Sequence, residues 1–272
     1  MVIKKVLKMS EGKKEILLGD CLELMKDIPD GSIDMILADL PYGTTACKWD
    51  TIIPFEPLWE QYERIIKPNG AIVLTASQPF TSALVMSNPK MFRYEWLWIK
   101  AKPSNFLMGK KQPMKYTENI LIFYKKQPTY NPIMIKRDEK NKRNNKKCGY
   151  LKYEALGINE DNKYVDRLKS GMNDYIYPRN YLFFSQNTKV KYVHPTQKPL
   201  ALFEYLIKTY TNENDLVLDN TAGGGTTALA CLNTNRQFIV MEKEQKYYDI
   251  ILKRVADFNK NFEPKTLFGN EM

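Results

Sequence analysis

The sequence has few of the residues from which metal sites and hydrolytic triads are built. It contains one histidine, His194, in 272 residues, which argues against a His-based metal site and a Ser-His-Asp triad. The four cysteines include no Cys-x-x-Cys pair, so we predict no metal site, reduced thiols and a cytoplasmic location. No run approaches the about 20 apolar residues that cross a bilayer, and the lysine-rich N-terminus lacks the apolar core of a secretory signal. We therefore expect no contact with a membrane.

Acidic residues are outnumbered, and the imbalance is local. The chain has 41 Lys and Arg against 31 Asp and Glu, a net charge of +10 and a pI near 9.2. Residues 125–193 hold 16 of the basic and 7 of the acidic residues, so a quarter of the chain carries nearly the whole excess. Such a segment, with tyrosines interleaved, attracts polyanions. Its densest basic run consists of Lys136, Arg137, Lys140, Lys142, Arg143, Lys146 and Lys147.

Strand-length apolar segments alternate with helical patterns on both sides of this basic segment. We expect a helix stopped by Pro68 and Gly70 and a second helix starting at Pro199. The rhythm predicts an α/β fold with a mostly parallel sheet and helices on both faces. Strands are expected at 16–18, 32–39, 70–77, 93–100 and 117–126. The predicted parts are a catalytic domain split into 1–124 and 193–260, a basic insert at 125–192 and a tail at 261–272.

A glycine-rich turn follows the apolar run that ends at Asp219. Glycines at a strand-to-helix turn let the backbone approach a ligand, and Glu242, twenty-three residues later at the end of another strand, can hold ribose hydroxyls. The pattern is neither GxGxxG nor a Walker motif, so S-adenosylmethionine fits better than a dinucleotide or a triphosphate. The alternative is a structural turn with a surface glutamate. The predicted cofactor contacts here are Asp219, Ala222, Gly223, Gly225, Thr226 and Glu242.

The stretch Asp39-Leu40-Pro41-Tyr42 follows another apolar strand. Ligands of open α/β sheets bind outside the carboxyl ends of the strands, which is where Asp39 is expected. Pro41 favours an extended backbone at Leu40, which can aim the Leu40 carbonyl outward beside the Asp39 carboxylate. Two such acceptors suit the two hydrogens of an exocyclic amino group, and Tyr42 offers a face for stacking. The alternative is a plain turn, because Asp, Pro and Gly are common turn residues.

In these motifs the chain resembles the amino-group DNA methyltransferases, which carry an (Asp/Asn/Ser)-Pro-Pro-(Tyr/Phe) motif. It is similar to their β arrangement, in which the catalytic motif precedes the target-recognition region and the cofactor motif comes last. The same order occurs here: Asp39 to Tyr42, the basic insert, "HPTQKP", then "DNTAGGGT". Two departures are visible. Leu40 replaces a proline whose carbonyl the family uses, and Asn220-Thr221 replace Pro-Phe in the cofactor motif.

The resemblance implies a Rossmann-like methyltransferase fold with permuted motif order. It implies that Asp20 and Cys21 meet the cofactor adenine, that Thr196 and Lys198 lie along its methionine end, and that the insert binds double-stranded DNA. A methyl group would pass to the amino group of a flipped base, and aspartate in the first motif position favours adenine N6. A restriction endonuclease partner and a homodimer are compatible with this hypothesis. The alternatives are a cytosine-N4 enzyme, an RNA or protein-amide methyltransferase, and a DNA-binding protein without activity.

Overall fold

The computed structural model describes residues 5–8, 13–44, 47, 50–136, 175–185 and 197–262. The chain forms two compact units, one made of 1–131 with 180–272 and a smaller one made of Pro132–Arg179. In the smaller unit, strand β7 (Ile135–Lys136) pairs with strand β8 (Tyr175–Ile176) in antiparallel fashion. None of the helices in the described ranges is long and apolar enough to cross a membrane.

The larger unit is built on a mostly parallel sheet. The strand order is β1-β2-β11-β10-β3-β4-β6-β5-β9, and the pairings of β1 with β2 and of β6 with both its neighbours are antiparallel. This confirms the predicted sheet. The strands are β1 (Lys5–Lys8), β2 (Lys14–Leu18), β3 (Ile33–Ala38), β4 (Ile66–Ala76), β5 (Phe92–Ile99), β6 (Thr117–Phe123), β9 (Tyr181–Phe183), β10 (Leu216–Asp219) and β11 (Gln237–Glu242).

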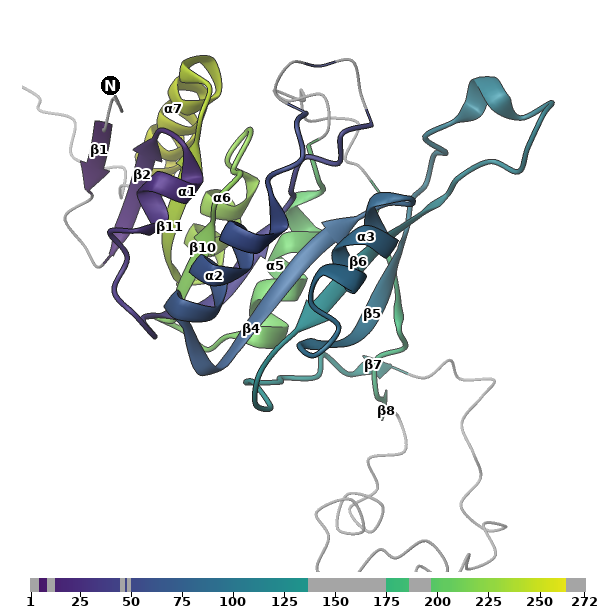
Figure 1. The fold of residues 1–272 in the computed structure, drawn as a ribbon, viewed down its shortest axis with the longest axis horizontal. Helices are drawn as coiled ribbons and strands as arrows, with labels where there is room; N and C mark the ends of the chain where they lie inside the picture. Colours follow the sequence, from purple (N-terminus) through teal and green to yellow (C-terminus); the bar gives the residue numbers. More distant parts are fainter. Residues whose placement is uncertain are drawn as a thin grey trace, which may run out of the picture. The chain divides into compact units, whose positions relative to one another are not determined.

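Helices cover both faces of the sheet, as predicted (Figure 1). Residues of β3 alternate between the two faces: Met35 and Leu37 pack with one set of helices, Ile36 and Ala38 with the other. Because both faces are covered, residues 35–38 of the strand form a continuous apolar run. One face carries α1 (Cys21–Met25), α2 (Phe55–Ile65) and α3 (Phe80–Ser87), and the other carries α5 (Leu200–Tyr210), α6 (Thr226–Asn233) and α7 (Gln245–Phe262).

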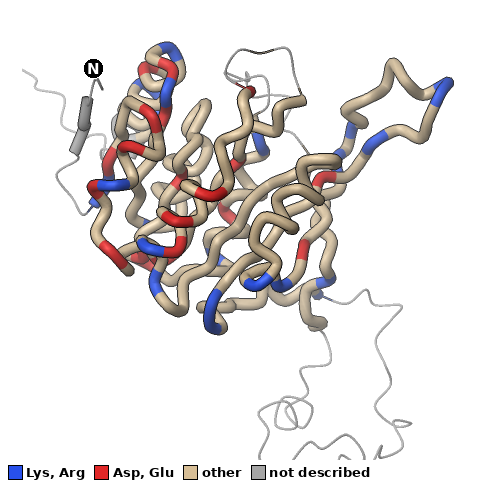
Figure 2. Tube along the Cα trace, in the orientation of Figure 1, with Lys and Arg blue, Asp and Glu red and all other residues tan. Residues whose placement is uncertain are grey.

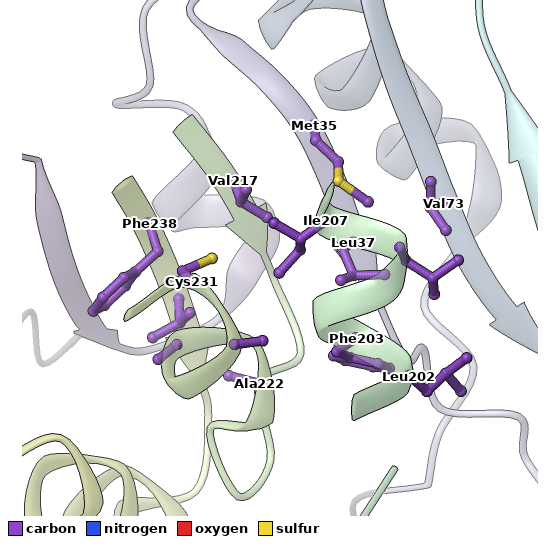
Figure 3. Packing of buried hydrophobic residues seen from close by; sticks show 14 of the residues in the cluster. Met35, Leu37, Val73, Leu202, Phe203, Ile207, Val217, Ala222, Cys231 and Phe238 are labelled. Carbon is purple, nitrogen blue, oxygen red and sulfur yellow. The ribbon is translucent and has the colours of Figure 1, made fainter. Parts of the chain in front are cut away.

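Packing of α5 on the sheet shows how distant segments are joined. Leu202, Phe203 and Ile207 of α5 lie in one buried cluster with Leu37 of β3 and Val73 of β4 (Figure 3). Each such side chain contributes about 1.5–3 kcal/mol when fully buried. The helix that follows the basic segment is thereby held against the strand that precedes the Asp39 loop.

The chain reverses its direction of travel across the sheet between β3 and β10, which are neighbours. After β3 it continues through α2 to β4, and after β10 it continues through α6 to β11 on the other side. A ligand crevice is expected outside the carboxyl ends of the strands at such a switch point. The loops that follow these two strands contain the predicted catalytic and cofactor motifs.

Two local expectations were wrong. Helix α2 ends at Ile65, before Pro68, because Ile66 already pairs with Ile33 of the neighbouring strand. The expected start of α5 at Pro199 is one residue early, because Pro199 is the cap and the helix begins at Leu200.

Strand β9 falls inside the predicted insert, yet it pairs with β5 in the main sheet. The predicted tail begins at 261, whereas α7 extends to Phe262.

Candidate active site

The loops after β3 and β10 open into one cavity of about 1110 Å³. Their backbones are joined directly, because the Thr221 hydroxyl donates a hydrogen bond of 3.1 Å to the carbonyl of Asp39. The predicted catalytic residues and most of the predicted cofactor residues therefore line a common space. Gly225 does not line it, because it packs against Ile251 of α7 (Gln245–Phe262). Among the residues that line it are Gly19, Asp20, Cys21, Asp39, Leu40, Pro41, Tyr42, Lys198, Asp219, Ala222, Gly223, Thr226 and Glu242.

The carboxylate of Asp39 is surrounded by donors. The Tyr42 hydroxyl donates to Oδ1 at 2.8 Å, and the Thr75 hydroxyl, at the end of β4, donates to the same oxygen. The ammonium of Lys198 lies 2.8 Å from Oδ1 and 2.7 Å from Oδ2. Lys198 was expected along the cofactor, and the structure places its side chain against the carboxylate of Asp39.

A second carboxylate lies behind Lys198. Glu118 of β6 has Oε2 at 3.6 Å from Lys198 Nζ, while its Oε1 accepts from Lys100 Nζ at 2.9 Å. The Oε2 atom is buried and accepts no hydrogen bond from the described residues. Burial alone would lower the pKa of Lys198, but the carboxylates of Asp39 and Glu118 outweigh it and raise that pKa above its ordinary value. Lys198 is thus a buried cation between two anions.

Tyr42 is less open than the sequence suggested. Its ring stacks on Phe80 with centroids 5.2 Å apart and an angle of 25°, so one face is already covered. Lys198 Nζ lies 5.5 Å from the ring centroid. Burial raises the pKa of the Tyr42 hydroxyl well above its usual value, and the negative charge of Asp39 adds to this. The phenol is therefore a hydrogen-bond donor at neutral pH.

The loop around Tyr42 is held by Asp50. The backbone N–H groups of Gly43 and Thr44 donate to the two carboxylate oxygens of Asp50, each at 2.9 Å. Gly43 has φ +67°, and an added Cβ would lie 2.9 Å from Ile52. The positive φ and this close approach explain why the turn has a glycine here. The Leu40 side chain is buried in the apolar cluster, which leaves its carbonyl as the relevant group.

On the cofactor side, two buried carboxylates have no cationic partner among the described residues. Asp219 accepts from the Thr221 N–H at 3.0 Å and from the Thr227 hydroxyl. Glu242 accepts from the N–H groups of Gly223 and Glu244, each at 2.8 Å. Burial raises the pKa of Asp219 to about 7, and burial also raises the pKa of Glu242.

The glycine turn between them is sterically demanding. Gly225 has φ +77° and its added Cβ would lie 2.9 Å from Ile251 of α7, so only glycine fits without strain. Ala222 is buried, and its N–H donates to the Met241 carbonyl at 2.9 Å. Thr226 is the buried first residue of α6. These contacts close the loop tightly against the ends of β10 and β11.

The departures from the family pattern have partners in the structure. Asn220 accepts a 2.7 Å hydrogen bond from the buried Tyr62 hydroxyl of α2, and Thr221 joins Asp39 as described above. Asp20 caps α1 by accepting from the Leu22 N–H at 3.0 Å, and Cys21 is the first residue of that helix. Both Asp20 and Cys21 line the cavity.

For the remaining predicted site residues, the structure describes no contact with this cavity. Lys136 lies exposed on β7 in the smaller unit. Outside the described residues lie Thr196, Arg137, Lys140, Lys142, Arg143, Lys146 and Lys147. Their assigned roles stay predictions.

Sequence reasoning missed Thr75, Glu118, Lys100 and Asp50. Thr75 stands near the carboxyl end of a predicted strand, and that position was an available signal. Glu118 lies on one strand of a hairpin and Lys100 directly follows the other, next to the connecting loop, and no local pattern specified how these strands pair. Asp50 had no signal beyond being near the motif.

The residues present fit S-adenosylmethionine. A cavity that contains two carboxylates without cations suits a ligand with positive charge and hydroxyl groups, and each carboxylate oxygen retains capacity for a further hydrogen bond. The doubly wound sheet, the switch-point cavity and this acidic glycine turn together define an S-adenosylmethionine-dependent methyltransferase.

Comparison with known proteins identifies the family. The model of the N6/N4 DNA methylase family matches residues 33–253, and the chain belongs to this family. Its cofactor is S-adenosylmethionine and its substrate is DNA. Type II methyltransferase M.BglII of Bacillus subtilis is 28% identical over 275 residues, covering 91% of this chain and 71% of the relative. DNA adenine methyltransferase YhdJ of Escherichia coli K12 is 29% identical over 255 residues, covering 89% and 82%.

Solved structures agree on the fold. The complex of M1.HpyAVI with S-adenosylmethionine is similar with a TM-score of 0.57 and 26% identity, over 88% of this chain and 98% of that one. The cytosine-N4-specific PvuII DNA methyltransferase has a TM-score of 0.66 at 16% identity, over 98% and 92%, so this likeness concerns the fold alone.

Proposed function

We propose that this enzyme methylates the N6 amino group of adenine at a specific DNA sequence, after the base has been flipped out of the duplex. The observation that carries the proposal is the Asp39 carboxylate, which lines the same cavity as the acidic glycine turn and already accepts N–H donors of an ammonium at 2.7–2.8 Å. An amino group offers the same kind of donor.

In this proposal the two N–H bonds of the base go to Asp39 and to the Leu40 carbonyl. The lone pair of an exocyclic amine is delocalised into the ring, which makes the nitrogen a weak nucleophile. Two acceptors favour a pyramidal nitrogen with a localised lone pair, and they stabilise the positive charge that grows on it in the transition state. The nitrogen would attack the methyl carbon directly, and the N–C bond would form as the methyl–sulfur bond breaks. The thioether product would leave, the nitrogen would lose one proton to solvent, and no covalent enzyme intermediate is needed.

Lys198 bonds to both oxygens of Asp39 and so competes with the amine for this carboxylate. The buried Oε2 atom of Glu118, 3.6 Å from Lys198 Nζ and without a hydrogen bond, is a ready alternative acceptor. We infer that Lys198 moves toward Glu118 as the base enters. A small side-chain shift then exposes Asp39 without leaving an unpaired buried ammonium, which would be costly.

The cofactor side is assigned to the glycine turn and its carboxylates. When bound, S-adenosylmethionine supplies the methyl group as an electrophile. In this proposal Glu242 holds ribose hydroxyls, and Asp219 favours a cationic ligand. Asp20 and Cys21 lie at the third loop of the same cavity and are assigned to the adenine end.

The flipped base would stack on Tyr42. One ring face is covered by Phe80, so the base would use the other. Flipping costs a few kcal/mol, and stacking on an aromatic ring returns about 1–3 kcal/mol per base. The basic insert at 125–192 is assigned to target recognition, with Lys136 and its neighbours on phosphates.

Cytosine N4 is the second candidate, because the matched family includes both amino groups. The aspartate at position 39 supports adenine, since the family tendency pairs aspartate with adenine and serine with cytosine. A relative at 29% identity that is named a DNA adenine methyltransferase supports it as well.

The deciding experiment is expression in a bacterial host that lacks its own DNA methylation, with single-molecule sequencing and mass spectrometry of the DNA. We expect N6-methyladenine in one recurring sequence, and no such mark from the Asp39→Ala variant. N4-methylcytosine in its place would overturn the choice of base, and modified RNA with unmodified DNA would overturn the substrate.

The cellular setting is also a proposal. The name of M.BglII as a type II methyltransferase supports a partner restriction endonuclease for this chain. A homodimer stays a prediction, as does the cytoplasmic location inferred from unpaired cysteines.

A further inference from the structure

A long loop between β5 and β6 stands beside the cavity. Residues 101–116, here called the 101–116 loop, join two antiparallel strands that pair from Phe92 to Ile99, and Figure 1 shows the loop projecting from the sheet. Its stem is ordered: the Ser104 N–H donates to the Lys115 carbonyl at 3.1 Å, and the Lys115 N–H donates to Asn105 Oδ1 at 2.5 Å. The tip is a single 3-10 turn, η1 (Phe106–Met108). The 101–116 loop is therefore a projection whose base is held by hydrogen bonds.

The tip of the 101–116 loop exposes apolar side chains. Phe106 is 68% exposed and Leu107 is 83% exposed. Single exposed apolar residues are ordinary, but five large ones within sixteen residues form a patch of the kind that marks a contact surface. The other three are Met108, Met114 and Tyr116.

The charge of the loop is of one sign. It contains four lysines and no acidic residue (Figure 2). In the described part of the chain none of the four pairs with a carboxylate. The lysines are Lys102, Lys110, Lys111 and Lys115. Unpaired lysines around an apolar tip fit a polyanion with an apolar interior, which describes duplex DNA with its phosphates outside and its stacked bases inside.

The position of the loop connects it to the reaction. Ser104, Asn105, Phe106 and Lys115 line the same cavity as Asp39. Lys100, at the foot of the loop, donates to Ser104 Oγ at 2.7 Å and to Glu118 at 2.9 Å, so the stem is fixed beside the catalytic carboxylates. A duplex that delivers a base to Asp39 must pass close to the 101–116 loop.

We propose that the 101–116 loop is a DNA-contacting wedge: Phe106 and Leu107 enter the base stack where the target base leaves it, while Lys110 and Lys111 bind flanking phosphates. The proposal rests on base flipping in the proposed function, and it holds for either target base. Apolar side chains inserted between base steps are a known way to unstack and kink a duplex locally. A second copy of this chain is the competing occupant of the patch.

The first test concerns the wedge. Methyl transfer is measured on two oligonucleotide duplexes that carry the sequence found by sequencing and differ only in the base opposite the target, matched or abasic. For Phe106→Ala/Leu107→Ala we expect kcat/KM about tenfold below wild type on the matched duplex, and near wild type on the abasic one, where the target base is already unpaired. Met86→Ala, a residue 72% exposed on α3, is the matched control and should equal wild type on both.

An equal loss on both duplexes would mean a merely structural role and would overturn the wedge, as would no loss on either. Self-association of wild type that disappears in the double variant, with unchanged methylation, would assign the patch to a second copy instead.

The second test concerns the lysines. Fluorescence anisotropy with a 30-base-pair duplex of unrelated sequence gives the slope of log affinity against log salt. Lys110→Ala/Lys111→Ala should reduce this slope by about 2, since each phosphate contact contributes about 0.9. Lys208→Ala/Lys253→Ala, two exposed lysines of α5 and α7, should leave it unchanged. Because the readout needs no methylation, it separates failure of the wedge from failure of the proposed function. An unchanged slope for Lys110→Ala/Lys111→Ala would overturn the phosphate contacts.

Discussion

The two sides of the cavity balance their charges in opposite ways. On the catalytic side, Asp39 has a buried lysine bonded to both its oxygens. On the cofactor side, Asp219 and Glu242 have only backbone N–H groups and a hydroxyl among the described residues, and the pKa of each is raised by burial.

This difference indicates where the positive charge comes from on each side. Under the proposed function, the cofactor would bring its own cation to the carboxylates that lack one. The base would bring a neutral amine, so Lys198 would stabilise Asp39 until the amine arrives. The following measurements test that contrast, from the largest expected effect to the smallest.

Removing the catalytic carboxylate should affect one side only. Asp39→Ala should lower turnover by at least about a hundredfold, because an acceptor that stabilises transition-state charge is lost. Cofactor affinity, measured by calorimetry, should stay within about twofold, and duplex binding should also be retained. A variant that loses cofactor binding together with activity would show that the two sides are not independent.

Removing the buried cation should destabilise the protein. Lys198→Met leaves Asp39 with hydroxyl donors alone, and the free energy of unfolding should fall by about 1.5–3 kcal/mol, the range for hydrogen bonds to charged groups. Chemical denaturation measures it. The matched control is Lys243→Met on the cofactor side, where Lys243 lies 3.6 Å from Asp20 and is 73% exposed, and the loss should be below about 0.5 kcal/mol. Equal losses in the two variants would contradict the contrast.

The cofactor side should respond to pH. Because the pKa of Asp219 is raised to about 7, its carboxyl is mostly neutral at pH 6 and mostly ionised at pH 8. A cationic ligand favours the ionised form, so cofactor affinity should rise with pH, by about tenfold between pH 6 and pH 8. Calorimetric titrations at several pH values give the slope. In Asp219→Asn the rise should largely disappear, and a rise that persists there would assign it to another group.

The smallest effect concerns the hydrogen bond between Tyr62 of α2 and Asn220 of the glycine turn. Tyr62→Phe removes the hydrogen bond to Asn220 and should lower the free energy of unfolding by about 1 kcal/mol, with Asp39 untouched. Tyr248→Phe, a buried tyrosine for which the described residues offer no hydrogen bond to the hydroxyl, should change stability less. The two denaturation curves would coincide if Asn220 plays no part in holding α2 against the glycine turn.

Much of this site could be predicted because it follows from strand ends. Apolar runs that stop at Asp39, Asp219 and Glu242 place three carboxylates at one edge of a parallel sheet. The glycines that follow Asp219 indicate a tight turn. Element type along the sheet was predictable for the same reason, since buried strands and amphipathic helices have distinct periods. Ends of elements were less predictable, as α2 and β9 show, because strand pairing overrides local stop signals.

The sequence by itself determined which groups stand at the carboxyl edge and therefore the class of chemistry, since both properties are local to each strand and its turn. Only the tertiary structure decided that Lys198 contacts Asp39, 159 positions away in the sequence, and that Glu118 lies on the other side of Lys198. It also decided that Phe106 and Leu107 are exposed to solvent. These facts depend on long-range packing: a lysine or a phenylalanine has the same local pattern whether it meets a buried carboxylate, a core or water.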